Sequence, residues 1–309
     1  MEHEGVLSRR AMLGAMAAGA AAAVLQPFSA FAQSIPITKP IPSSGEKLPV
    51  VGLGSWITFN VGDDPELRAE CTAVMRAFFA AGGRMIDSSP MYGSSQPVIG
   101  HGLAQLGRPQ ALFSADKVWI ASGSRGPEQV EESRAHWGVR RFDLLQVHNL
   151  LAWEEHLPTL LRMKAEGRVR YAGITTSEGR RHEEMEKIMA SQPIDFVQVT
   201  YNVLDREVED RILPLAQERG IAVIVNRPFR EGALIRWIER HPLPAWAGEV
   251  GAASWAQLIL KFIVSHPAVT CAIPATSKVA HVKENMGAAT GALPDAAMRR
   301  RMAAHVAAL

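Results

Sequence analysis

The sequence predicts an α/β fold of the (β/α)₈, or TIM, barrel type with an N-terminal β-hairpin. Eight apolar, strand-like runs end near residues 54, 89, 119, 148, 175, 202, 227 and 275, and the first six intervals are 25 to 35 residues long. Segments with apolar residues at three- and four-residue spacing lie between them, for example residues 66–81, 154–166, 183–190, 209–219 and 252–265. Regular βα units in this number favour a closed barrel. An open doubly wound sheet is the alternative, but no Gly-x-Gly-x-x-Gly turn follows the first strand.

Residues 1–32 are predicted to be an export signal, which leaves residues 33–309 for the barrel. Arg9 and Arg10 precede a 15-residue apolar run of mostly small residues, and Ala30-Phe31-Ala32 offers a cleavage site. The run is shorter than the roughly 20 residues that a membrane-spanning helix needs. We interpret it as a twin-arginine signal and expect a periplasmic or other extracytoplasmic protein. An ordinary secretory signal and an uncleaved anchor are the alternatives.

The folded part is expected to begin with a hairpin, because two short extended runs between residues 35 and 50 flank Ser43-Ser44-Gly45. The longest interval between strand ends, 48 residues, contains Pro, Gly and Trp. We interpret it as a loop or short helix over the barrel mouth. The Ala-rich end of the chain after Leu293 is predicted to be helical, with Arg299 to Arg301 on a solvated face.

The composition, with 47% hydrophobic and 21% charged residues among 309, suits one large globular domain. The net charge of +2 gives no electrostatic reason to expect nucleic acid or an anionic membrane as a partner. Cys71 and Cys271 lie far apart without a metal-ligand spacing, so no metal site is expected. We interpret both as buried apolar residues, one on a helix and one in the last strand, and not as a disulfide.

Polar side chains stand where predicted strands end, at Asp87, Tyr92, Lys117 and His148. The loops that follow barrel strands converge, so these side chains are expected to share one pocket. Each also has an ordinary structural explanation when it is taken alone, such as a helix cap for Asp87 or a core hydrogen bond for His148. Together they provide what is needed to hand a proton to a carbonyl oxygen.

The expected chemistry depends on the ammonium group beside the phenol. Tyrosine has an ordinary pKa of about 10, and a unit charge at about 4 Å contributes up to roughly 4 kcal/mol at an effective dielectric of about 20. Lys117, held by Asp87, is therefore expected to lower the pKa of Tyr92 by about 2–3 units. His148 would orient the carbonyl. No side chain here is an obvious nucleophile, so a bound hydride donor is implied, and a hydrolase is disfavoured.

These residues lie in motifs that resemble the aldo-keto reductase superfamily over residues 35–293. The resemblance implies reduction of an aldehyde or ketone with NADPH as hydride donor. It also implies that Tyr92 is the general acid, that Lys117 and Asp87 tune it, and that His148 positions the carbonyl. The matching segments are Lys47-Leu-Pro-Val-Val-Gly-Leu-Gly-Ser-Trp56, Asp87-x4-Tyr92-Gly93, Lys117-Val-Trp119, Asp143-Leu-Leu-Gln-Val-His148, Gln198-Val-Thr-Tyr-Asn202, Ile273-Pro274 and Glu284-Asn285.

Trp56 and Trp119 fall at positions that line the substrate pocket in the family; the alternative is that they are barrel-core aromatics. The nicotinamide side departs from the family pattern. Thr175-Thr176 replaces the usual Ser-Asn, and Asn226 replaces the tyrosine on which the nicotinamide ring stacks, with Phe229 or a neighbour as a substitute.

The residues that the family places near the adenosine part of the cofactor are partly retained. The usual basic positions near the adenosine phosphate are occupied by Ala275 and His281, and Lys278 falls between them. NADP(H) is expected, and NAD(H) remains possible. The cofactor-binding residues implied by the resemblance are Thr175, Gln198, Arg227, Lys278, Glu284 and Asn285.

An exported reductase would have to keep its cofactor bound, because free nicotinamide cofactors are not expected outside the membrane. A small carbonyl substrate and an unidentified redox partner are then implied, and no stable membrane insertion is expected after signal cleavage. The alternative from a different class is a cofactor-binding regulatory or sensing module with little turnover.

Overall fold

The structure is a computed structural model that describes residues 35–309, so the predicted export signal at residues 1–32 lies outside the described residues. Within residues 35–309, eight parallel strands form one sheet in which strands consecutive in the chain are neighbours. The strands are β3 (Leu53–Gly54), β4 (Met85–Asp87), β5 (Phe113–Val118), β6 (Phe142–Val147), β7 (Val169–Thr175), β8 (Phe196–Thr200), β9 (Ala222–Asn226) and β10 (Val269–Ala272).

The sheet closes on itself where the segment around β3 meets the segment around β10. The backbone N–H of Gly52 donates to the carbonyl of Ala272 at 2.8 Å, and the N–H of Gly54 donates to that of Pro274 at 3.1 Å. A Cβ on Gly54 would approach the carbonyl oxygen of Ile273 to 2.7 Å, so this closure requires a glycine. The predicted (β/α)₈ barrel is confirmed, and the open sheet is excluded.

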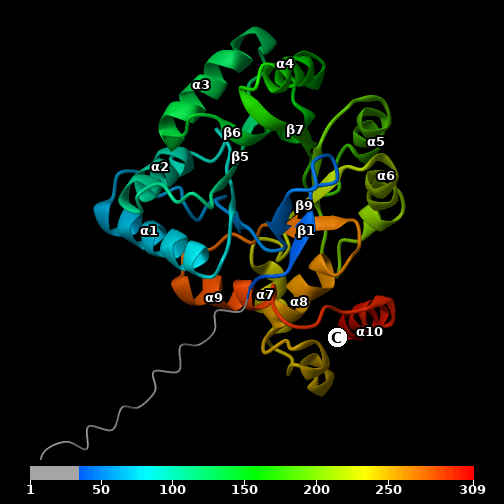
Figure 1. The fold of residues 1–309 in the computed structure, drawn as a ribbon. Coiled ribbons are helices and arrows are strands. Elements are labelled where there is room, and N and C mark those ends of the chain that lie inside the picture. The colour runs from blue at the N-terminus through cyan, green and yellow to red at the C-terminus, as the bar shows by residue number, and fades with distance from the viewer. Residues whose placement is uncertain (1–34) are drawn as a thin grey trace, which may run out of the picture. The chain divides into compact units, whose positions relative to one another are not determined.

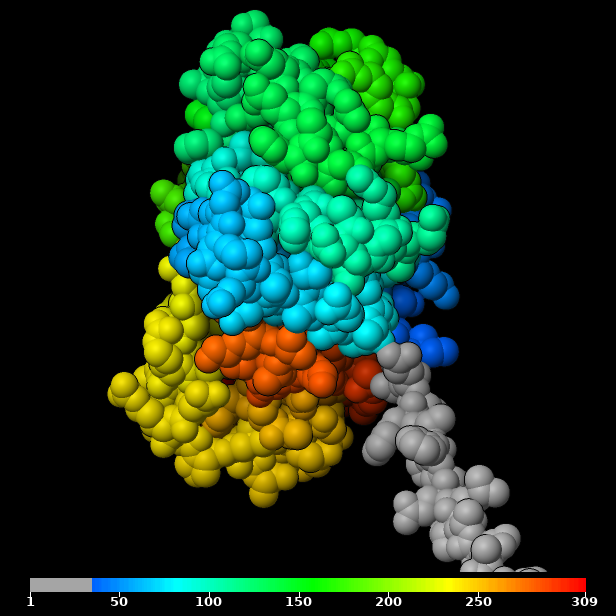
Figure 2. Space-filling view, turned by 90° about the vertical axis from the view of Figure 1, so that its left-hand side faces the viewer, coloured from blue at the N-terminus to red at the C-terminus, as the bar shows by residue number. Residues whose placement is uncertain are grey.

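Helices cover the outside of the barrel, and Figure 1 shows them as a ring around the strands. Figure 2 shows α9 directly beside α1, so the first and last βα units also meet in the outer layer. Among residues 35–309, no helix combines the length and the apolar character needed to cross a membrane. The helices of the ring are α1 (Pro65–Ala80), α2 (Ser95–Gln105), α3 (Gly126–Trp137), α4 (Trp153–Ala165), α5 (His182–Ser191), α6 (Ile212–Arg219), α8 (Trp255–Val264) and α9 (Val279–Gly287).

The predicted N-terminal hairpin is present as β1 (Thr38–Pro40) and β2 (Lys47–Pro49), which pair antiparallel. Ile41 and Leu48 are buried in one apolar cluster with side chains from the beginnings of the barrel strands, such as Phe113 and Phe196. The hairpin therefore closes the end of the barrel at which the strands begin. Glu46 also forms ion pairs with Arg84 and Arg170 on the barrel.

The chain ends in a helix as predicted, α10 (Ala296–Ala307), but Arg299 does not lie on a solvated face. Its side chain is only 11% exposed and pairs with Glu209. The guanidinium also donates to the Tyr201 hydroxyl and lies 4.3 Å from the centroid of the Phe262 ring. The expectation was wrong for Arg299 because its guanidinium contacts a partly buried carboxylate and two aromatic side chains. Arg301 on the same helix is exposed, as expected.

The two cysteines are where the sequence placed them. Cys71 is buried in α1, and Cys271 is buried in β10. Neither forms a disulfide.

Candidate active site

A cavity of about 640 Å³ opens at the carboxyl end of the barrel strands. Its walls come from the loops after most of these strands and from the start of α9. The predicted helix over the mouth is α7 (Ala233–Ile238), whose Ile235 and Arg236 line the cavity. This volume lies within the range of about 300–1,000 Å³ that is typical of ligand and cofactor pockets.

Lys117 and Asp87 form a buried ion pair below the cavity. Strands β4 and β5 pair in parallel with Asp87 opposite Ala115, which brings Lys117 just above the carboxylate. Lys117 Nζ lies 2.5 Å from Asp87 Oδ1 and donates to the carbonyl of Ser88 at 2.8 Å. Burial alone would lower the pKa of Lys117, but Asp87 and the Tyr92 phenol outweigh it and raise that pKa. The ammonium therefore stays charged.

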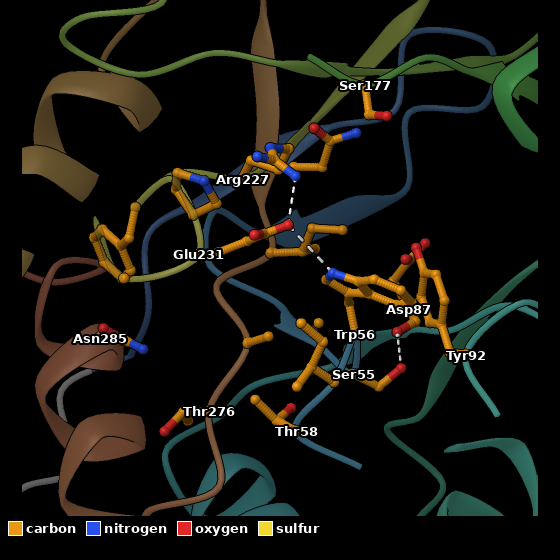
Figure 3. Close-up of a pocket in the computed structure, with 18 of the residues that line it drawn as sticks. Ser55, Trp56, Thr58, Asp87, Tyr92, Ser177, Arg227, Glu231, Thr276 and Asn285 are labelled. Carbon is orange, nitrogen blue, oxygen red and sulfur yellow. Dashed lines mark hydrogen bonds and ion pairs between the residues drawn. The ribbon is translucent and has the colours of Figure 1, made fainter. Parts of the chain in front are cut away.

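The second carboxylate oxygen of Asp87 is held by two amides. Gln198 Nε2 donates to Asp87 Oδ2 at 2.9 Å, and Gln146 Nε2 approaches it at 3.5 Å. The backbone carbonyl of Asp87 accepts from the Ser55 hydroxyl at 2.8 Å (Figure 3). Asp87 is thus immobilised at both its side chain and its backbone, and it fixes the position of Lys117.

Tyr92 lies above this pair, so the predicted residues Asp87, Tyr92, Lys117 and His148 are brought together. Lys117 Nζ is 5.1 Å from the centroid of the Tyr92 ring. The Trp56 ring lies 4.9 Å from the Tyr92 ring, and the His148 ring meets it edge-on at 5.7 Å. Trp56, Tyr92 and His148 all line the cavity.

The expected lowering of the Tyr92 pKa is wrong. Burial raises the pKa of the phenol by more than Lys117 lowers it, and the carboxylate of Asp87 raises it further. A lone ammonium beside the phenol would lower this pKa, whereas the structure places a nearly neutral ion pair beside a largely buried phenol. The phenol therefore keeps its proton, which is the form that a proton donor needs.

His148 is neutral in this site. Burial, assisted by the charge of Lys117, lowers the pKa of its imidazole to about 2. Its Nδ1 lies 2.7 Å from the hydroxyl of Ser89. Its Nε2 has no hydrogen-bond partner among residues 35–309, and the ring borders the cavity. The free nitrogen is available to a bound molecule.

The residues implied to bind a cofactor all border this same cavity: Thr175, Gln198, Arg227, Lys278, Glu284 and Asn285. The side-chain amide of Asn285 forms no hydrogen bond within the described part of the chain, although the residue is only 6% exposed. Figure 3 shows Asn285 and Thr276 on the opposite side of the cavity from Trp56 and Tyr92. Polar groups therefore border the cavity on opposite sides.

Arg227 is already engaged with two carboxylates. Its guanidinium pairs with Glu178 at 3.0 Å and with Glu231 at 2.5 Å. Glu231 also accepts from the indole N–H of Trp56 at 3.3 Å, and Figure 3 shows this carboxylate between Arg227 and Trp56. Charged groups from the loops after β7 and β9 thus meet Trp56 across the mouth.

Some residues considered in the sequence lie elsewhere. Trp119 is 41% exposed at the end of β5 and is not among the residues that border the cavity, unlike Trp56. Thr176 directs its hydroxyl toward Met185 of α5. Asn226 borders the cavity, but its amide is bonded to the Thr176 carbonyl and the Thr200 hydroxyl. Phe229 also borders the cavity, as the expected substitute would.

Sequence reasoning missed Ser89, Gln146 and Glu231. Ser89 lies two positions after Asp87, and Gln146 lies two positions before His148. Because alternate residues of a strand face the same side, the position of His148 could have identified Gln146 as a second side chain that points into the barrel. No pattern in the sequence indicated that Glu231 contacts Trp56, because the two residues lie 175 positions apart.

The chain matches one family profile and is similar to several reductases. The Aldo/keto reductase family profile matches residues 50–305. Methylglyoxal reductase YeaE of Escherichia coli is 28% identical over 253 residues, which cover 80% of this chain and 88% of that protein. The NADH-specific methylglyoxal reductase of Escherichia coli is 25% identical over 244 residues, covering 67% and 72%.

Solved structures share the fold. A thermostable aldo-keto reductase in complex with the inhibitor epalrestat superposes with a TM-score of 0.72 at 26% identity, covering 87% of this chain and 99% of that one. An aldo/keto reductase from Klebsiella pneumoniae, in complex with NADP and acetate, gives a TM-score of 0.70 at 22% identity, covering 84% and 91%. At 22% identity the second likeness concerns the fold alone.

Proposed function

Because the chain belongs to the aldo/keto reductase family, we propose that it reduces an aldehyde or ketone to an alcohol with NADP(H) and uses Tyr92 as the general acid. The family makes it an oxidoreductase that acts on carbonyl compounds. One observation carries the assignment of the acid. The buried Lys117–Asp87 pair lies against the ring of Tyr92, with Lys117 Nζ 5.1 Å from its centroid, at the edge of the cavity.

The residues present fit a nicotinamide dinucleotide. The unpaired amide of Asn285 can donate to and accept from an adenine edge. Lys278 stands immediately before the N-terminus of α9, where a positive side chain and free backbone N–H groups favour a phosphate. Thr175 and Gln198 supply polar groups at the Tyr92 end. When bound there, NADP(H) supplies the hydride for the carbonyl carbon.

Lys278 supports NADP(H) as the cofactor, since the additional phosphate of NADP(H) carries the charge that this side chain would neutralise. The other polar residues around the cavity fit NAD(H) equally well. A structural relative from Klebsiella pneumoniae carries NADP, and one Escherichia coli relative is described as NADH-specific.

In the proposed reaction the carbonyl oxygen lies between Tyr92 and His148. The phenol of Tyr92 gives its proton to this oxygen, and Lys117 stabilises the phenolate that remains. Asp87 keeps the ammonium charged and in place. His148 is neutral and donates a hydrogen bond that orients the carbonyl. Trp56 packs against Tyr92 and helps to hold its ring in place.

The test is Tyr92→Phe with methylglyoxal, the substrate named for the Escherichia coli relatives, as the first carbonyl. We expect reduction to fall by about 10²–10⁴-fold, because proton transfer by a positioned acid contributes that much. The affinity for NADP(H), measured by calorimetry, should stay unchanged. A wild-type protein that binds the dinucleotide tightly but reduces no carbonyl in a broad panel would contradict the enzyme and support the sensing module.

We also propose that residues 1–32 are a twin-arginine signal and that residues 33–309 work in the periplasm. The paired Arg9 and Arg10 before a short apolar run support this proposal. The test is intact-mass analysis of the protein from periplasmic extracts, with an Arg9→Lys, Arg10→Lys double variant as the control. We expect a cleaved chain that releases NADP(H) on denaturation, and retention of the double variant in the cytoplasm. Equal export of both proteins would refute the twin-arginine route.

A further inference from the structure

Ser89 forms a buried contact with His148, the residue proposed to orient the carbonyl. It follows β4 by two residues, is fully buried, and lies in the chain between Asp87 and Tyr92. Its hydroxyl oxygen lies 2.7 Å from Nδ1 of His148 and accepts from the backbone N–H of Met91 at 3.2 Å. Within residues 35–309 the hydroxyl has no other hydrogen-bond partner.

These two contacts determine the direction of the Ser89–His148 hydrogen bond. A buried hydroxyl proton needs an acceptor, because leaving a buried donor unpaired costs about 1–3 kcal/mol. The Met91 contact uses the hydroxyl oxygen as an acceptor. The only acceptor left for the hydroxyl proton among the described residues is His148 Nδ1. Ser89 therefore donates and Nδ1 accepts.

This direction decides where the imidazole carries its proton. A neutral imidazole has one N–H and one lone pair, so an accepting Nδ1 places the proton on Nε2. The imidazole is neutral because burial and Lys117 keep its pKa low. Nε2 has no partner in the described part of the chain, and His148 borders the cavity. Its N–H is thus presented to whatever occupies the cavity beside Tyr92.

We propose that Ser89 is a positioning residue that holds His148 in the tautomer with the proton on Nε2, so that the imidazole donates to the carbonyl oxygen of the substrate. In the other tautomer the Nε2 lone pair would face that oxygen and repel it. The identity of the acceptor rests on the proposed carbonyl reduction. The tautomer itself does not, because it follows from the contacts of the protein alone.

The first measurement needs neither substrate nor cofactor. Long-range ¹H–¹⁵N spectra of protein labelled at histidine report which ring nitrogen carries the proton, and the His148 signals are assigned by their loss in His148→Gln. We expect a protonated Nε2 and an unprotonated Nδ1 in the wild type. Ser89→Ala should give a mixture of tautomers, and Ser89→Thr should restore the wild-type pattern. A wild-type Nδ1 that carries the proton, or no change in Ser89→Ala, would overturn the inference.

Ser133→Ala is the matched control. Ser133 is also buried, and its hydroxyl accepts from Gln96 Nε2 at 2.9 Å between α2 and α3, away from the cavity. The Ser133→Ala variant loses a buried hydroxyl at a comparable cost in stability, and Ser133 does not contact His148. Its histidine spectrum and its activity should match the wild type.

Steady-state kinetics then test whether this tautomer contributes to carbonyl reduction. Ser89→Ala should lower kcat/KM for carbonyl reduction about tenfold, which corresponds to one hydrogen bond at the upper end of the usual strength. Ser89→Thr should stay within about threefold of the wild type, and the Kd for NADP(H) should not change in either variant. A changed tautomer with unchanged kcat/KM would refute the positioning role. A wild type that shows the Nε2–H tautomer but reduces no carbonyl would refute the proposed function and leave the tautomer assignment supported.

Discussion

Asp116→Asn is the sharpest test of the electrostatics around this site. Asp116 is 0% exposed on β5, next to Lys117 in the chain, and faces the helical layer. Its carboxyl accepts from Gln96 Nε2 at 2.9 Å and from the backbone N–H of Lys117 at 2.7 Å. No cationic side chain forms an ion pair with it among residues 35–309. Burial raises the pKa of this carboxyl to about 7, although Lys117 and the hydrogen bonds act to lower it.

The sign of the effect follows from this raised pKa. An unfolded aspartate titrates near 3.9, so between that pH and about 7 the folded protein binds a proton that the unfolded chain does not. The stabilisation is fully present below the unfolded pKa and is lost as the pH rises through the folded one. For a folded pKa of about 7, the loss between about pH 5.5 and 8.5 is on the order of 2 kcal/mol.

Asparagine cannot ionise, so Asp116→Asn should escape this loss. The free energy of unfolding of the variant, relative to the wild type, should rise by about 2 kcal/mol over the same interval. Urea denaturation at three pH values measures it, provided that the m-value stays constant. Ser133→Ala serves as the control, because Ser133 touches the same Gln96 but does not titrate. A difference between Asp116→Asn and wild type that does not change with pH would refute the reasoning.

Further changes probe the rest of the cavity and the hairpin. Lys278→Ala should weaken NADP(H) binding about tenfold and NAD(H) binding hardly at all, as measured by calorimetry; equal losses would contradict a phosphate contact. Glu231→Leu should raise KM for the carbonyl about three- to tenfold with kcat nearly unchanged in steady-state assays. The change removes the carboxylate that accepts from the Trp56 indole but leaves Tyr92, the proposed proton donor, in place. Glu46→Gln should cost about 1 kcal/mol in urea denaturation, and the cost should shrink in high salt, because its ion pair with Arg170 is partly exposed. A salt-independent cost would point to packing instead.

The fold could be predicted because it repeats. Each βα unit carries its own apolar strand and amphipathic helix, and the regular spacing of strand ends indicated the barrel. Strand ends were less certain. The strand predicted to end near Ser89 ends at Asp87, although Ser88 still donates its backbone N–H to the Ala115 carbonyl. The pairing of β4 with β5 ends over these residues because Pro90 turns the chain toward α2.

The site could be predicted only as far as backbone position decides it. Strand ends brought Asp87, Lys117 and His148 together because neighbouring parallel strands begin and end in step. The partners could not be found in this way. Ser89 and His148 are 59 residues apart, and their contact depends on side-chain directions that no spacing reports. The exposure of Trp119 depends in the same way on packing that becomes known only with the structure.

The raised pKa of Tyr92 bears on how the proposed proton transfer would work. Had Lys117 alone lowered the pKa by about 2–3 units, part of the phenol would ionise near neutral pH, and that part would have no proton to give in the proposed reaction. Asp87 offsets much of the ammonium charge, and burial penalises the phenolate, so the proton is retained. In the proposed reaction, the negative charge left on Tyr92 would lie beside an ammonium that is already desolvated and fixed, 5.1 Å from the ring. Stabilisation then appears chiefly in the transition state, where it accelerates the reaction, and not in the ground state.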